Sequence, residues 1–260
     1  MSRTVWVGPV SSSQVHAPAG DLFIPCVGAT ARPGCADLDL ASVLASKGVK
    51  GVTGDIVLHG FSAGGDAIKK FLKDPAARAR TTAVVTHDAT FQGFGSDEGF
   101  VAYGTEAAQG LPGRVFVATT SSAGSSNLRG GISDSASMEA LRQKIEVNTG
   151  QKFQSVTTPW APKPPVKAWK LGGVVFLDFG TAFTHAEHVT VLAPLVFDNV
   201  VAPMLAAPHT STPPVPSPPL PLPWTFPPSV PALSGRPVWP AVLVVGGAGI
   251  FLYALVRAFK

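Results

Sequence analysis

Five consecutive residues in this chain have the types and the spacing that nucleophilic catalysis requires. They read Gly60-Phe61-Ser62-Ala63-Gly64, and the apolar, β-branched run at 56–58 before them predicts a short buried strand. After them, apolar residues at helical spacing within 67–72 predict an amphipathic helix. A serine on a sharp bend between a strand and a helix lifts its hydroxyl above the end of the sheet. The pattern therefore predicts that Ser62 is a nucleophile for an acyl carbon.

The residues around Ser62 also predict where an oxyanion would be bound. Positions two before and two after the serine lie too close together for a Cβ atom, so glycine suits both of them. The helix that follows aims its first N–H groups at the same point. We expect the N–H of Ala63 to form half of an oxyanion hole and Gly8, at the end of the first predicted strand, to supply the other half. A plain glycine-rich turn is the competing interpretation; a phosphate-binding loop is excluded, because Asp66 stands where that motif has lysine.

A base and an acid are expected where other strands end, because the carboxyl ends of parallel strands meet at one edge of a sheet. Polar residues at predicted strand ends are His87, Asp88, those of 119–122, His185 and His188. For the base we prefer His185, which is nearer to its strand end, over His188. For the acid we prefer Asp88, which directly follows a continuous apolar strand. Asp134 is the alternative, although it equally suits the acidic first turn of a helix.

Strands and helices are predicted to alternate over 3–205, which favours a mostly parallel sheet with helices on both faces. With serine, acid and histidine in that chain order, the sequence resembles the α/β-hydrolase superfamily. The resemblance rests on the Gly-Phe-Ser-Ala-Gly turn, on Asp88 and on the segment 184–188. It implies that Ser62 attacks, that His185 takes and returns the proton, and that Asp88 orients the imidazole. The His-Gly-Gly-Gly motif of many such enzymes is missing from this sequence.

Charge and cysteine content exclude some classes of protein. The net charge is +4, but Arg236, Arg257 and Lys260 in the tail account for three of these charges. The rest of the chain is nearly neutral, so that it lacks the excess of basic residues that is typical of nucleic-acid-binding proteins. Two cysteines, Cys26 and Cys35, form neither a disulfide framework nor a zinc site. We expect two unpaired thiols, with a loop-closing bridge as the alternative in an oxidising compartment.

The C-terminal fifth of the chain has a different composition. Residues 207–240 hold 13 of the 25 prolines and one charge, which predicts an extended linker after a domain at 1–206. Residues 241–257 predict a single transmembrane helix, since 241–256 carry no charge and Trp239 lies at one flank. A C-terminal anchor favours a cytoplasmic catalytic domain, whereas the basic C-terminal residues favour the opposite orientation.

The sequence therefore predicts a membrane-anchored serine hydrolase that cleaves an ester-type acyl bond, with a small or lipid-like substrate and no cofactor. A non-catalytic α/β-hydrolase-like binding module on a membrane stalk is the alternative. A metal-dependent hydrolase is a third interpretation, because His59, His87, Asp88, His185, Glu187 and His188 are expected near strand ends. We expect no metal, because these residues do not have the spacing of a known zinc motif.

Overall fold

The structure is a computed structural model. It describes residues 3–15, 20–26, 34–49, 56–90, 98–122, 134–207, 244–246 and 249–251. The chain divides into two compact units, Met1–Val215 and Pro216–Lys260.

Eight strands of the first unit form one sheet in the order β2-β1-β3-β4-β5-β8-β7-β6. The first six in this order are parallel, and β7 and β6 continue the sheet in antiparallel pairing. This confirms the mostly parallel sheet that the alternation of elements predicts. The strands are β1 (Arg3–Val7), β2 (Leu22–Ile24), β3 (Ile56–Phe61), β4 (Thr81–His87), β5 (Val115–Thr120), β6 (Gln154–Ser155), β7 (Lys167–Leu171) and β8 (Val174–Asp178).

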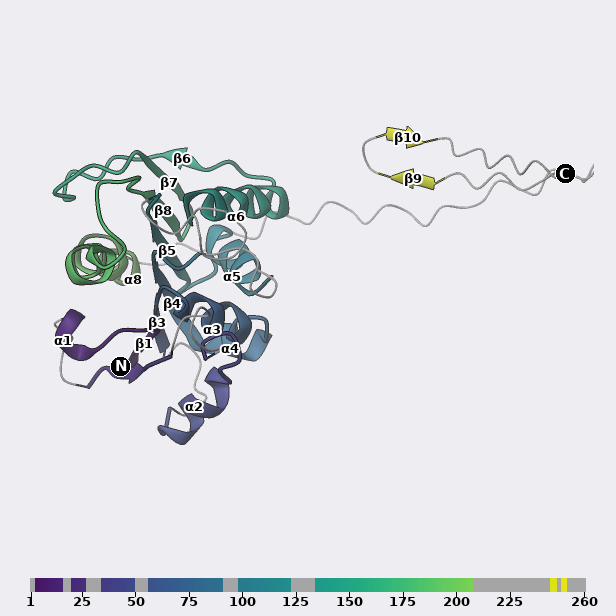
Figure 1. Cartoon of the computed structure of the whole chain (residues 1–260). Helices are drawn as coiled ribbons and strands as arrows, with labels where there is room; N and C mark the ends of the chain where they lie inside the picture. Colours follow the sequence, from purple (N-terminus) through teal and green to yellow (C-terminus); the bar gives the residue numbers. More distant parts are fainter. Residues whose placement is uncertain are drawn as a thin grey trace, which may run out of the picture. The chain divides into compact units, whose positions relative to one another are not determined.

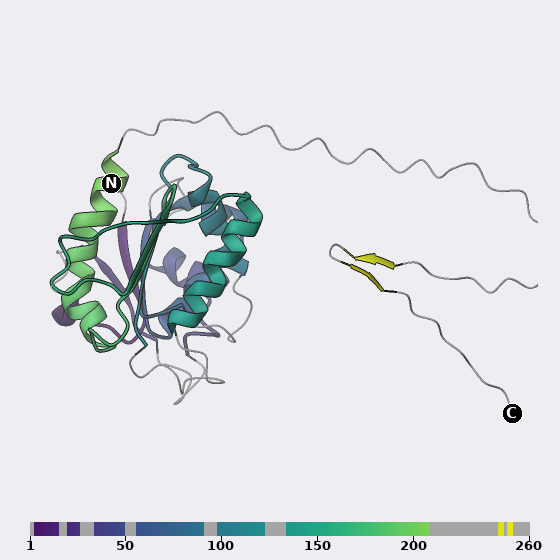
Figure 2. The same ribbon diagram turned by 90° about the horizontal axis from the view of Figure 1, so that it is seen from above.

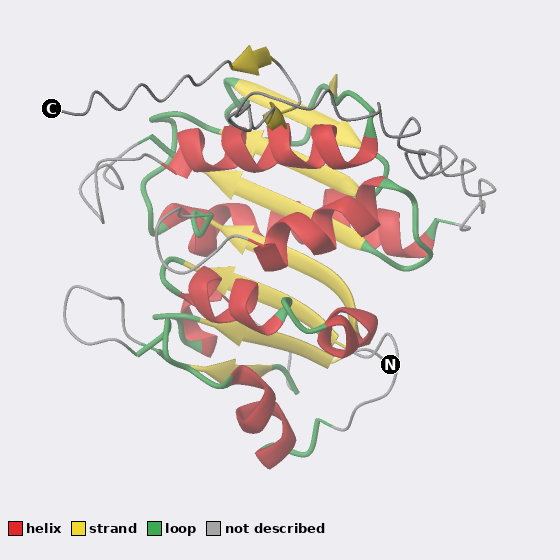
Figure 3. Ribbon diagram, turned by 90° about the vertical axis from the view of Figure 1, so that its right-hand side faces the viewer, coloured by secondary structure: helices red, strands yellow, loops and turns green. Residues whose placement is uncertain are grey.

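Helices cover both faces of this sheet, which Figure 2 shows edge-on. One face carries α3, α5 and α6, and the other carries the helical segment His188–Ala206, whose end is labelled α8 (Figure 1). Figure 3 shows helices lying over one face of the strands. All residues of β3 and β5 are buried, because both of their faces are covered. The helices before this segment are α1 (Ser12–Val15), α2 (Leu40–Ser46), α3 (Gly64–Phe71), α4 (Pro75–Arg80), α5 (Glu98–Ala108) and α6 (Asp134–Thr149).

The segment His188–Ala206 is continuous and mixes α-helical with π-helical turns. It consists of η2 (His188–Leu192), α7 (Ala193–Val196), η3 (Phe197–Val201) and α8 (Ala202–Ala206). Leu192, Val196 and Val200 pack into the apolar layer on this face of the sheet. The segment begins at His188, which is therefore a buried helical residue.

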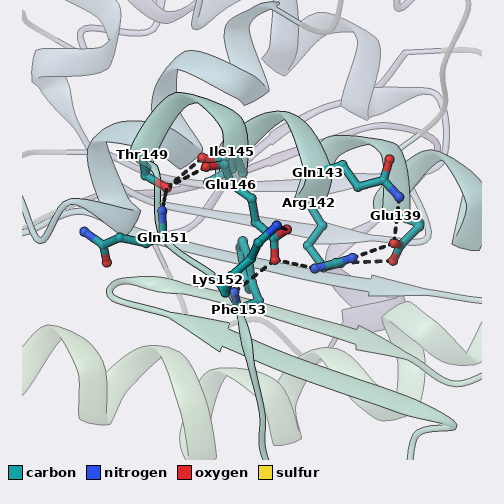
Figure 4. A network of polar contacts seen from close by, with 9 residues as sticks. All are labelled: Glu139, Arg142, Gln143, Ile145, Glu146, Thr149, Gln151, Lys152 and Phe153. Atoms are coloured by element: carbon teal, nitrogen blue, oxygen red, sulfur yellow. Dashed lines mark hydrogen bonds and ion pairs between the residues drawn. The ribbon is translucent and has the colours of Figure 1, made fainter. Parts of the chain in front are cut away.

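A buried carboxylate fastens α6 to the chain that leads into β6. Glu146 accepts hydrogen bonds from Arg142, from Lys152 Nζ and from the Phe153 N–H, as Figure 4 shows. Arg142 also contacts Glu139 one turn earlier on the same helix. Three donors on one carboxylate compensate for its burial.

Cys26 and Cys35 form a disulfide bond, which corrects the expectation of two unpaired thiols. The fold brings their Cα atoms to 5.0 Å, within the range that a bridge requires. Cys26 lies just past β2, and its N–H donates to the Gly8 carbonyl. A spacing of nine residues does not by itself bring two cysteines within bonding distance, so the sequence does not reveal this approach.

The tail predictions fall mostly outside the described residues. This holds for 208–240 of the linker and for most of the predicted transmembrane helix at 241–257. Within the latter, the structure has two short antiparallel strands, β9 (Val244–Gly246) and β10 (Gly249–Phe251), in place of a helix. β-Branched residues around glycines favour such a hairpin. The membrane span therefore stays a prediction.

In the described part of the chain, one helix has the length and the composition to cross a membrane. It is His188–Ala206, with a mean hydropathy of 1.8 over its most apolar window. This segment also covers one face of the sheet, where apolar side chains are needed for packing.

Candidate active site

Ser62 lies on the tight turn between β3 and α3, as the pentapeptide predicts. Its φ of +52° is in the left-handed region, which L-residues other than asparagine and aspartate seldom adopt. Two backbone hydrogen bonds hold this conformation: Ser62 N–H donates to the His87 carbonyl at 3.3 Å, and Gly65 N–H donates to the Ser62 carbonyl at 3.1 Å. Strain that the surroundings maintain in this way is typical of a nucleophile turn.

Close approach of backbone explains the glycines that follow Ser62. A Cβ on Gly64 would lie 2.0 Å from the Val7 carbonyl oxygen, and one on Gly65 would lie 1.9 Å from the Ala89 carbonyl oxygen. On the other side, a Cβ on Gly60 would meet Ile68 Cδ1 at 2.9 Å. The turn therefore fits between β1 and the end of β4 because these positions carry no side chain.

Replacing Gly65 by alanine should lower the free energy of unfolding by about 2–4 kcal/mol, because its methyl group would overlap backbone that cannot move aside. Urea unfolding followed by circular dichroism measures this loss. Gly150→Ala is the control: Gly150 has φ +68° but open space around it, so we expect a loss of about 1 kcal/mol. Equal losses for the two variants would contradict the packing argument.

Asp88 and His185 form a direct pair. The Asp88 carboxylate accepts a hydrogen bond from His185 Nδ1 at 2.7 Å, although 97 residues separate them in the sequence. Because an ionised carboxylate only accepts hydrogen bonds, this contact places a proton on Nδ1 and leaves Nε2 as the ring nitrogen that does not face Asp88. The structure thus brings together the histidine and the acid that the sequence analysis preferred.

Asp88 is fully buried at the end of β4 and has a φ of +48°. Its carboxylate also accepts hydrogen bonds from the N–H and from the hydroxyl of Ser121, at 2.7 and 2.8 Å. From the sequence, Ser121 was predicted to lie at a strand end, and no role was assigned to it. The signal was weak, since a serine after an apolar strand is common.

The short turn that carries His185 is fixed on both sides. Thr184 N–H donates to the Glu187 carboxylate at 2.7 Å, and Glu187 N–H donates back to Thr184 Oγ1, which forms a capping box before η2. The His185 ring stacks on Phe61 with 4.6 Å between ring centroids. Since Phe61 directly precedes Ser62, this contact brings the imidazole to the turn that carries Ser62.

Ser62 and His185 lie at one edge of the sheet without a direct bond. Among the described residues, no hydrogen bond joins Ser62 Oγ to His185. In free enzymes this bond is often long and shortens when substrate binds. The geometry therefore supplies an acid–base pair and an adjacent strained serine.

The two predicted oxyanion donors differ in the structure. Ala63 precedes the first residue of α3, and its N–H has no partner within the described residues. Gly8 N–H instead donates to the Ile24 carbonyl at 3.3 Å. The expectation that Gly8 offers a free donor is therefore corrected: pairing of β1 with β2 engages it.

The alternative residues are placed elsewhere. His188 is buried, and its Nδ1 bonds to Thr119 Oγ1 at 2.9 Å. Burial lowers the pKa of His188 to about 4. Asp134 is the first residue of α6, and its side chain is not among the described ones.

Two further histidines are buried in the layer beneath His188–Ala206. His59 Nδ1 and His87 Nε2 are 3.1 Å apart, and Trp6 stacks on the His59 ring with 4.1 Å between centroids. Burial lowers the pKa of His59 to about 3, and burial together with the charges of His59 and His188 lowers that of His87. Sequence analysis placed His59 and His87 near strand ends but did not predict that both strands bury them.

No metal centre is found among these residues. Within the described ranges, no group of three or more His, Cys, Asp or Glu side chains is arranged to hold a metal ion. His59 and His87 contact each other and Trp6, so their rings belong to the packed layer.

Comparisons with known proteins give no relative. No protein-family model matches the sequence, and neither the curated proteins nor the solved structures contain a match. The function is therefore inferred from the geometry described above.

Proposed function

We propose that this chain is a serine hydrolase of the α/β-hydrolase type that cleaves an ester-type acyl bond with Ser62, His185 and Asp88. One observation carries the proposal: the 2.7 Å pair of Asp88 and His185 lies beside a serine with a φ of +52° at the start of a helix. A strained serine alone, or a hydrogen-bonded histidine–aspartate pair alone, can serve a purely structural role. Their coincidence at the carboxyl edge of one parallel sheet supports nucleophilic catalysis.

In this mechanism Ser62 Oγ attacks the carbonyl carbon while its proton passes to His185 Nε2. The Ala63 N–H donates to the oxygen that becomes negative. The tetrahedral intermediate then breaks the ester C–O bond, and the imidazolium of His185 protonates the departing alkoxide, which leaves an acyl group on Ser62. Water, deprotonated by His185, attacks this acyl-enzyme; the bond from the carbonyl carbon to Ser62 Oγ then breaks, and the imidazolium returns its proton to Oγ as the carboxylic acid leaves. Asp88 holds the tautomer and stabilises the imidazolium throughout.

The C-terminal tail adds a membrane anchor and a linker to the proposal. Residues 241–257 would anchor the hydrolase as a single-pass membrane protein, and 207–240 would act as a proline-rich linker. The support is compositional: the absence of charge over 241–256 and the density of prolines before it. An anchored enzyme would act on small or lipid-like esters near the membrane.

Covalent labelling tests the proposal directly. A fluorophosphonate probe should form a stoichiometric adduct on the full chain, and mass spectrometry of peptides should locate it on Ser62, because an activated serine attacks phosphorus and expels fluoride. Ser46, an exposed serine whose hydroxyl donates to the Val43 carbonyl, is the internal control and should stay unlabelled. An unlabelled Ser62 in folded protein would overturn the proposal.

The second candidate is a non-catalytic binding module on the same fold. Two observations favour it: Ser62 Oγ is not bonded to His185 within the described residues, and Gly8 N–H is already engaged. The labelling experiment separates the two candidates, because a binding module would not react.

A further inference from the structure

The end of β5 holds Asp88 at three points. Asp88 N–H donates to the Thr119 carbonyl at 2.8 Å, which fixes its backbone. Ser121 N–H donates to Oδ1 and Ser121 Oγ donates to Oδ2, which fixes the plane of the carboxylate. Asp88 and Ser121 are both fully buried. These contacts fix both the left-handed backbone of Asp88, with its φ of +48°, and the direction of its carboxylate.

The two contacts of Ser121 have different consequences. The N–H bond is made to Oδ1, the carboxylate oxygen that does not accept the histidine bond. The hydroxyl bond is made to Oδ2, which is the same atom that accepts from His185 Nδ1. Ser121 Oγ and His185 Nδ1 therefore share the negative charge of one oxygen.

We infer that Ser121 is a positioning residue that sets both the orientation of Asp88 and the strength of its bond to His185. The inference rests on the proposed hydrolase function, in which His185 must be a neutral base and Asp88 must point at Nδ1. By drawing charge from Oδ2, the hydroxyl weakens the attraction of Asp88 for an imidazolium. By holding the carboxylate plane, it keeps Oδ2 aligned with Nδ1.

Ser121→Ala removes the hydroxyl and keeps the N–H contact. We expect kcat for a short-chain p-nitrophenyl ester to fall about tenfold with little change in KM, since a hydrogen bond to a charged group that orients the base is lost. We also expect the acidic limb of the pH–kcat/KM profile to move upward by about half a unit, because Oδ2 then attracts the imidazolium more strongly. A purely structural role would lower activity without moving this limb.

A titration that does not depend on activity separates this inference from the proposed function. In the full chain labelled with ¹⁵N-histidine, NMR should show the His185 pKa higher in Ser121→Ala than in the unaltered protein. The other titratable groups near His185, those of Glu187 and His188, are the same in both proteins. If ester hydrolysis is absent but the pKa shift occurs, the proposed function fails and the positioning role stands. If hydrolysis is present and neither the profile nor the His185 pKa moves, the positioning role fails.

Two variants control for packing. Ser135→Ala removes a matched serine–aspartate contact at the next strand end, where Ser135 Oγ donates to Asp178 Oδ1 at 2.8 Å. It should leave kcat and the pH profile unchanged. Ser121→Cys keeps the shape of the buried side chain but has a weaker hydrogen-bond donor. We therefore expect the pH–kcat/KM profile and the His185 pKa to shift in the same direction as in Ser121→Ala, and this test remains if the alanine variant does not fold. No shift in folded Ser121→Cys would overturn the inference.

Discussion

Ser62→Ala is expected to lower kcat/KM for short-chain esters by roughly 10⁴- to 10⁶-fold, because the covalent route disappears when Oγ is removed. The fold should be unaffected, since no hydrogen bond of Ser62 Oγ is found within the described residues. The initial rate of p-nitrophenolate release, measured beside a circular dichroism spectrum, tests both statements.

His185→Ala should cause a loss of similar size, and the double variant Ser62→Ala with His185→Ala should lose little more than either single one. Nucleophile and base act as a unit, so removing one makes the other ineffective. His188→Asn is the comparison, because His188 bonds to Thr119 rather than to Asp88; we expect it to lose less than about tenfold. Additive losses, or a greater loss at His188 than at His185, would show that another group is the base.

The positions of the candidate site residues were predicted from the sequence better than the contacts around them. The Gly-Phe-Ser-Ala-Gly turn can be recognised because its local pattern of strand, glycines and helix determines its own conformation. Asp88 and His185 follow from a general rule, that parallel strands end at one edge of the sheet. Their pairing at 2.7 Å agrees with that rule.

Contacts that depend on pairing between distant segments were not predicted. Gly8 was expected to donate to an oxyanion, but its N–H is used by β2, and the order of strands at that edge has no local signal. Cys26 lies just past β2, and its disulfide bond to Cys35 could not be inferred from the spacing of the two cysteines in the sequence. Ser121 likewise reaches Asp88 only because β5 lies beside β4.

Acid is expected to unfold this protein steeply, because three neutral histidines are buried in one layer. Burial holds the folded-state pKa of His59 at about 3 and that of His188 at about 4, and it lowers that of His87 as well. In the unfolded chain each would titrate near 6.5. Since these folded pKa values lie below the unfolded one, the unfolded state binds more protons: the stabilisation is complete well above pH 6.5 and is lost as the pH falls from there toward 4.

The expected change in the free energy of unfolding with pH is large enough to dominate the stability of the domain. Each buried histidine contributes about 1.4 kcal/mol per pH unit once its unfolded form is protonated, so that three of them give a slope of about 4 kcal/mol per pH unit near pH 5.5. Domains are stable by only about 5–15 kcal/mol, so we expect unfolding between about pH 4 and 5. Urea unfolding at a series of pH values between 8 and 5 measures the slope above the range in which ordinary carboxylates titrate.

His59→Phe identifies the source of this slope. The Nε2 atom of His59 has no hydrogen-bond partner within the described residues and its ring stacks on Trp6, so that an apolar ring fits the site at the cost of the Nδ1 contact with His87. The variant should lose about a third of the slope, whatever its stability at pH 8, because the slope counts protons rather than contacts. An unchanged slope in His59→Phe, or a free energy of unfolding that is constant from pH 7 to 5, would show that these histidines are not the acid-sensitive groups.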